Sequence, residues 1–221
     1  MWNLVYKEIV QLRSYLIQTL GFLAVAILLF GRLSPVLMMS YLYVFPVVMA
    51  MTLAQLAFTQ EERGNTFAFL RSLPIRPREI VGAKYVVSVL VTLAFVVVLA
   101  VAGPAGAASG TALLAAISTV TLVSFLLAAV SYFLHFWLGV KSARVALILL
   151  SFVAAIPMML VLRSGPRGVS AFFAERLSGL TSLAGSPGGV ALAFLLGLAV
   201  LFVSYAASAK LFASRDLCPL P

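Results

Sequence analysis

Six long apolar runs alternate with short polar segments along the chain, at about residues 15–31, 36–58, 84–102, 112–138, 145–162 and 190–210. A helix needs about 20 predominantly apolar residues to cross the hydrocarbon core of a bilayer, and most of these runs are of that length. Turn-forming segments such as Gly103–Gly106 and Ser186–Gly189 separate them. We therefore predict an all-α polytopic membrane protein with six transmembrane helices, forming a single domain over residues 1–221.

Two further segments lie outside the predicted spans. Residues 1–14 place Trp2, Val5, Ile9 and Leu12 at helical spacing, which predicts an amphipathic helix lying at the membrane interface. Residues 163–189 form the longest external segment, and an apolar stripe there predicts a short helix in the outer leaflet. An irregular loop interrupted by its glycines is the alternative.

Composition and charge agree with a membrane protein. Hydrophobic residues make up 63% of the 221 residues and charged residues 10%, whereas soluble proteins average about 25% charged residues. The net charge is +9, but the basic residues flank apolar runs, where they face lipid headgroups and set orientation, so nucleic-acid binding is disfavoured. With the N-terminus inside, only Arg32, Arg163, Arg167 and Arg176 of the 15 Lys and Arg residues lie outside. This distribution predicts a multi-pass membrane protein with both termini cytoplasmic.

Catalytic chemistry is not indicated by the residues. No Asp, Glu, Lys or Arg lies within the predicted spans away from their ends, and no glycine-rich phosphate-binding loop is present. The lone His135 has Ser131 one turn earlier, but no setting for a nucleophile surrounds them, so we expect structural hydrogen bonding. Cys218 is the only cysteine. We predict no enzyme activity, no catalytic residue, no metal site and no cofactor on this chain.

The polar island Gln60–Lys84 is the most informative segment, with five basic and three acidic residues between two charge-free runs. Asn65 or Thr66 can cap a short helix that Pro74 ends, and Pro77 can start the next helix. The short helix presents apolar and basic side chains for a cytoplasmic partner: Thr66, Phe67, Phe69, Leu70, Arg71 and Leu73. A connector lying among the headgroups is the alternative.

The island also carries a family resemblance. Glu61-Glu62-Arg63-Gly64-Asn65-Thr66, Leu70-Arg71-Ser72-Leu73-Pro74-Ile75, Arg78-Glu79-Ile80-Val81 and Ala83-Lys84 resemble the cytoplasmic loop of ATP-binding-cassette type-2 exporter permeases, of the six-span bacterial half-size kind. Within that family the chain looks closest to exporters of amphipathic peptides such as phenol-soluble modulins, and to those of bacitracin or lantibiotic resistance.

The resemblance implies a location in a bacterial cell (plasma) membrane and specific partners. These are a second permease subunit, often a second copy forming a homodimer, and separate cytoplasmic nucleotide-binding ATPase subunits that hold the ATP and magnesium. It implies that the segment at residues 59–84 is a coupling loop, with a coupling helix over Thr66–Leu73 that moves when the ATPase closes.

The cargo path has no motif and can only be inferred from helix faces. One face of the second span carries Tyr41, Phe45, Thr52 and Gln55, and the fifth span offers Ser151 and Met158. Ordinary helix packing would explain the same pattern. An apolar, uncharged cavity between such faces would suit hydrophobic or amphipathic cargo, such as a peptide, an antibiotic or a lipid-like molecule. The alternative function is a non-transporting accessory or immunity protein that docks a cytoplasmic partner.

Overall fold

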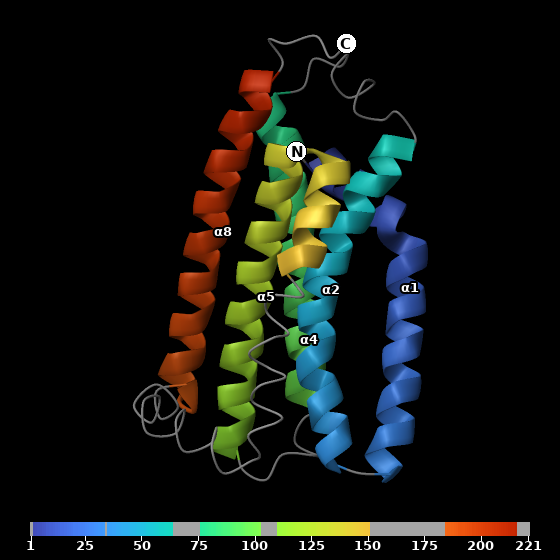
Figure 1. The fold of residues 1–221 in the computed structure, drawn as a ribbon. Coiled ribbons are helices and arrows are strands. Elements are labelled where there is room, and N and C mark those ends of the chain that lie inside the picture. Colours follow the sequence, from blue (N-terminus) through green and yellow to red (C-terminus); the bar gives the residue numbers. More distant parts are fainter. Residues whose placement is uncertain (1, 34, 64–75, 103–109, 151–183, 216–221) are drawn as a thin grey trace.

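The computed structural model describes residues 2–33, 35–63, 76–102, 110–150 and 184–215, and these residues form a bundle of long helices (Figure 1). The helices are α1 (Trp2–Leu33), α2 (Pro35–Arg63), α4 (Pro77–Ala102), α5 (Gly110–Leu138) and α8 (Pro187–Arg215). A further helical stretch covers residues 140–150. The start of α1 and the end of α8 lie at the same end of the bundle, together with the end of α2 and the start of α4 (Figure 1). We call this end the loop end, because residues 64–75 connect α2 to α4 there.

Four helices in the described part of the chain are long and apolar enough to span a bilayer: Trp2–Leu29, Arg78–Val101, Leu113–Leu138 and Pro187–Ala213. Helix α2, with 29 residues, runs beside them. The all-α membrane class is thereby confirmed. Of the predicted span at 145–162, only residues 145–150 are described, so the count of six spans stays a prediction. Most of the external segment 163–189 also lies outside the described residues.

Local sequence signals set several helix ends. Pro77 begins α4 and Glu79 lies in its first turn, as the island's pattern predicts. Ser186 caps α8, because its hydroxyl accepts a hydrogen bond from the Gly189 N–H at 3.0 Å. Gly139 ends α5 with a φ of 80°, a conformation that favours glycine, and the chain is helical again from residue 140. Between the predicted spans 112–138 and 145–162, the helical structure is thus interrupted at Gly139 alone.

Helix α1 differs from the expected arrangement of an interfacial helix followed by a separate span. It runs without interruption from Trp2 to Leu33, because no proline occurs in this stretch and Gly21 is accommodated within the helix. Its N-terminal part packs on the bundle through Val5 and Leu12, which are buried, whereas Trp2 is 78% exposed. Placement of residues 1–14 at the membrane interface stays a prediction.

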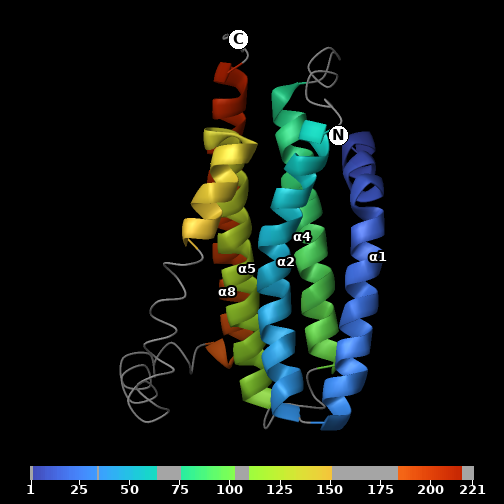
Figure 2. The same ribbon diagram turned by 45° about the vertical axis from the view of Figure 1, so that its right-hand side comes forward.

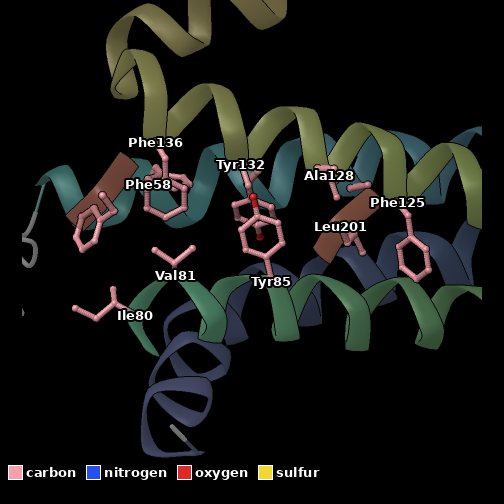
Figure 3. Packing of buried hydrophobic residues seen from close by; sticks show 13 residues of the cluster. Phe58, Ile80, Val81, Tyr85, Phe125, Ala128, Tyr132, Phe136 and Leu201 are labelled. Carbon is pink, nitrogen blue, oxygen red and sulfur yellow. The ribbon is translucent and has the colours of Figure 1, made fainter. Parts of the chain in front are cut away.

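Helix α1 lies at one side of the bundle against α2 and α4, and α8 lies at the other against α5 and α4 (Figure 2). An aromatic core near the loop end joins α2, α4, α5 and α8 (Figure 3). Its ring contacts include Phe58 with Phe136 at 4.9 Å and Tyr85 with Tyr132 at 5.0 Å between centroids. These contacts hold together the helices that enter and leave the 64–75 loop.

Candidate functional site: a buried ionic cluster at the loop end

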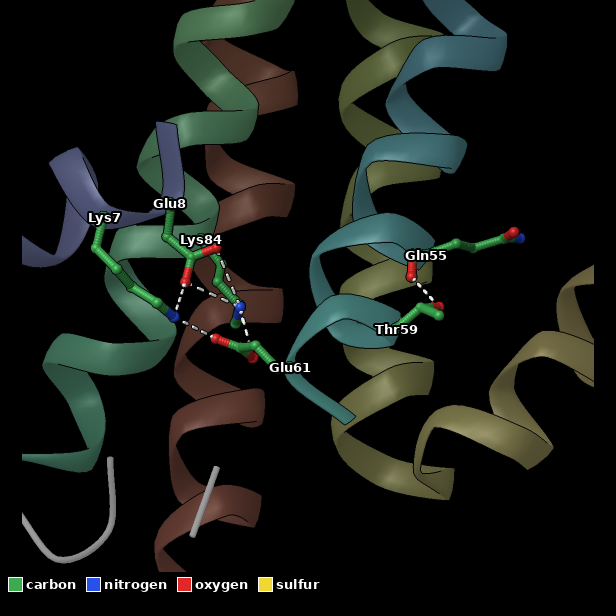
Figure 4. A network of polar contacts seen from close by, with 6 residues as sticks. All are labelled: Lys7, Glu8, Gln55, Thr59, Glu61 and Lys84. Atoms are coloured by element: carbon green, nitrogen blue, oxygen red, sulfur yellow. Dashed lines mark hydrogen bonds and ion pairs between the residues drawn. The ribbon is translucent and has the colours of Figure 1, made fainter. Parts of the chain in front are cut away.

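Four charged side chains from three helices meet at the loop end (Figure 4). Lys84 of α4 places its Nζ 3.1 Å from Glu8 Oε1 and 2.8 Å from Glu61 Oε2. Lys7 places its Nζ 3.1 Å from Glu8 Oε1 and 2.7 Å from Glu61 Oε1. Each ammonium therefore bridges the same two carboxylates, and we call these four residues the ionic cluster.

The ionic cluster is electrically neutral and largely enclosed. Glu61 and Lys84 are 0% and 1% exposed, Glu8 is 3% exposed, and only the Lys7 side chain, at 29%, reaches the surface. Lys84 also lies 5.1 Å from the centroid of the Phe58 ring, in a cation–π contact. Removing a buried charge from its partners is far more costly than removing an exposed one, so the pairing fixes how the three helices meet.

The cluster lies at the two helix ends that residues 64–75 connect. Glu61 lies in the last turn of α2, Lys84 lies two turns inside α4, and residues 64–75 connect these helices. The cluster thus ties together the two helices that carry the loop and fastens both to the start of α1. A displacement of the end of α2 or of the start of α4 is consequently transmitted through the cluster to all three helices.

Sequence reasoning placed these charges among the headgroup-facing residues and did not find the cluster. Lys84 is the first residue of the predicted span 84–102, and the structure buries it two turns inside α4. One signal was present in the sequence: Glu8 shares a helical face with Val5 and Leu12, both of which are buried. An acidic residue on a buried face requires a partner of opposite charge.

The coupling-helix residues Thr66, Phe67, Phe69, Leu70, Arg71 and Leu73 lie outside the described residues, as do Ser151 and Met158 and the side chain of Tyr41. Their roles stay predictions.

The remaining residues of the predicted cargo path, all on α2, differ in their surroundings. Phe45 is 7% exposed and packs edge-on against Phe95 of α4, with ring centroids 5.4 Å apart. Thr52 accepts a hydrogen bond from the Tyr15 hydroxyl at 3.2 Å. Gln55 is partly exposed, and its side chain points away from the ionic cluster (Figure 4). Phe45 is buried, and Thr52 is bonded to α1. The Gln55 side chain is partly exposed and makes no hydrogen bond to another helix among the described residues.

His135 has a structural environment. Its Nδ1 lies 2.7 Å from the Ser131 carbonyl oxygen, and its ring stacks on Phe58 with centroids 4.7 Å apart. This arrangement agrees with the structural hydrogen bonding expected from the sequence.

A bundle of long apolar helices, with charge concentrated at one end and an ionic cluster that joins α1, α2 and α4 there, defines a multi-pass α-helical membrane protein. The family model described as ABC-2 family transporter protein matches residues 3–213, so the chain belongs to this family. A comparison with curated proteins gave no significant match. The resemblance found in the island is confirmed at the family level: the chain is an ABC-2 type permease, the membrane component of an ABC transporter, and the family implies an ABC ATPase as its partner.

Proposed function

We propose that this permease exports hydrophobic or amphipathic cargo, such as a peptide, an antibiotic or a lipid-like molecule, out of the cell. ATP, with its magnesium, is hydrolysed on a separate cytoplasmic subunit. The loop end faces the cytoplasm in this proposal, supported by charge: among the described residues only Arg32 of the Lys and Arg residues falls at the opposite end.

The observation that carries the proposal is the ionic cluster between the end of α2 and the start of α4. Force applied to residues 64–75 by an ATPase acts on the end of α2 and the start of α4. Glu61 and Lys84 join these helices through a 2.8 Å ion pair, and both are linked to α1. The three helices therefore move together, which is the mechanical requirement for coupling ATP hydrolysis to a change in the bundle.

The docking contacts in this proposal come from the loop itself. The coupling helix proposed over Thr66–Leu73 would dock the ATPase, with Phe67, Phe69 and Leu70 as its apolar anchors. Large apolar anchors in a partner's groove commonly contribute about 2 kcal/mol or more each. Two permease copies, each with one ATPase, complete the transporter.

The cargo path in this proposal runs along the face of α2 that carries Gln55. Thr59, on the same face, accepts a hydrogen bond from Arg144 at 3.0 Å and donates one to the Gln55 carbonyl at 2.6 Å. The amide of Gln55 then adds an uncharged polar group to this face, where the hydrated side of an amphipathic molecule can bind.

The proposal is tested by reconstituting the permease with its ATPase and comparing the wild type with a Phe67→Ala/Leu70→Ala variant. We expect the variant to lose ATPase binding and cargo-stimulated ATP hydrolysis, whereas Ser72→Ala, a small change in the same loop, keeps both. Unchanged binding and hydrolysis in the double variant would refute the docking role. Binding without any response of hydrolysis to cargo in the wild type would instead favour an accessory or immunity protein.

A further inference from the structure

A groove lies between α4 and α8. Its volume is about 480 Å³, within the range of roughly 300–1,000 Å³ typical of ligand sites. Leu90 and Phe202, at its rim, are 45% and 68% exposed, so the groove opens sideways, toward the surroundings of the bundle. Its walls are formed by Gly82, Tyr85, Val86, Val89, Leu90, Leu198, Leu201, Phe202 and Tyr205.

The polar atoms in these walls are already engaged. The Tyr85 hydroxyl lies 2.7 Å from Ser204 Oγ and 3.0 Å from Ser208 Oγ, and the Tyr205 hydroxyl donates to the Arg78 carbonyl oxygen at 3.3 Å. The surface that the groove presents to a ligand therefore consists of methyl groups and aromatic ring faces. A hydrocarbon chain fits these walls, whereas a polar headgroup would lose its hydrogen bonds there.

The length and depth of the groove match one leaflet of a membrane. From Gly82 to Leu90 α4 rises about 12 Å at 1.5 Å per residue, and half of a hydrocarbon core of about 30 Å is about 15 Å. The groove begins one turn inside the loop end, on a helix that spans from Arg78 to Val101. An acyl chain entering from the loop end would therefore lie along the groove.

A cation marks the mouth of the groove. Arg78 lies one turn before Gly82 on the same face of α4, and its side chain is exposed. Arg76, two residues earlier, is exposed as well, and Glu79 is the carboxylate nearest in sequence. A guanidinium can bind a phosphate through two parallel hydrogen bonds, which an ammonium cannot do in the same geometry.

We infer that the α4–α8 groove binds one acyl chain of an anionic phospholipid whose phosphate is held by Arg78. Exposed apolar side chains also lie outside the groove on α8: Leu195 is 64% exposed and Val203 is 68% exposed. In a membrane such side chains face lipid rather than water. The bound lipid fills the space between the helix that leaves the loop and the last helix, and so supports the packing of α4. This inference does not depend on the direction of transport or on the ATPase.

The test measures which lipid contacts the groove. Starting from the full-length permease with Trp2→Phe and Trp137→Phe, Phe202→Trp places a single tryptophan at the rim. Ile17→Trp, at a 58% exposed position of α1, gives a control at a similar distance from the loop end when it is combined with Arg13→Gln, which removes the exposed cation one turn before it. Each variant is reconstituted in mixtures of phosphatidylglycerol and phosphatidylcholine in which one or the other is brominated, and fluorescence quenching reports the relative affinities.

We expect quenching at position 202 to show a preference of roughly fivefold for phosphatidylglycerol, the effect of one cation near an anionic surface, and quenching at position 17 to follow the bulk composition. Adding Arg78→Gln should remove the preference, whereas Lys141→Gln, which removes an exposed charge at the same end, should leave it. Equal quenching by both lipids at position 202 would overturn the inference. So would quenching by neither, since a second permease copy would then cover the groove.

Discussion

Replacing Lys84 by methionine tests the ionic cluster most sharply. Methionine keeps the length of the apolar stem but removes the ammonium, which lies within 3.2 Å of both Glu8 oxygens and 2.8 Å from Glu61 Oε2. Two carboxylates that are almost fully buried then share Lys7 as their one remaining cation in the cluster. The cluster changes from neutral to a net charge of −1.

The size of the effect follows from burial. Breaking a buried ion pair by removing one partner costs about 3–5 kcal/mol, because an uncompensated charge stays in a medium of low dielectric constant. Lys7→Met removes the same charge from the same carboxylates, but at a site that is 29% exposed, where water can replace the ammonium. We expect about 1.5–3 kcal/mol for that variant, the range of hydrogen bonds to charged groups.

The measurement is the free energy of unfolding of the purified permease in mixed micelles, with sodium dodecyl sulfate as the denaturant and tryptophan fluorescence as the signal. The double variant Lys84→Met with Glu61→Gln restores the neutrality of the cluster. We therefore expect its loss of unfolding free energy to be roughly 0.5–3 kcal/mol smaller than the sum of the losses in the two single variants. Lys141→Met, at an exposed position at the same end, serves as the control and should change little.

Two outcomes would refute this reasoning. One is a Lys84→Met variant no less stable than Lys7→Met, which would mean that burial does not decide the strength of the cluster. The other is strict additivity of Lys84→Met and Glu61→Gln, which would mean that the two residues do not interact.

Two further predictions concern orientation and cargo. Single cysteines at Ser72 and Ser170, in a Cys218→Ser background, should react with a membrane-impermeant thiol reagent on intact cells at position 170 and not at position 72; the reverse pattern would invert the topology. Gln55→Leu should change cargo preference or basal ATP hydrolysis while the transporter still assembles, because it removes an uncharged polar group from the α2 face of the proposed cargo path; lower thermal stability with an unchanged cargo profile would place Gln55 in helix packing instead.

Local signals predicted much of the fold. Pro77 and Glu79 start α4, Gly139 ends α5, and the Ser186–Gly189 break supplies the cap of α8, because caps and turns depend on a few neighbouring residues. The family resemblance likewise depended on a contiguous stretch, the island at Gln60–Lys84.

The ionic cluster could not be predicted in the same way. Its pairs between helices join residues that are 23, 54 and 76 positions apart, and no periodicity within one helix specifies which charge on another helix will lie opposite. The expected boundary between an interfacial helix and a span near residue 14 also depended on treating Lys7 and Glu8 as headgroup-facing charges. Once Glu8 and Lys84 pair, the start of α1 can pack on the bundle and the helix continues without a break.

The central claim is that the cluster couples the loop to the bundle, and cargo transport in vesicles containing the permease and its ATPase tests it most directly. The comparison is between the wild type and Lys84→Met with Glu61→Gln, which keeps the cluster neutral and leaves the docking residues of the loop intact. We predict that the variant still binds the ATPase and that the ATPase still hydrolyses ATP. ATP-dependent cargo transport is lost, and so is the stimulation of ATP hydrolysis by cargo. Transport at the wild-type rate by this variant would contradict the account.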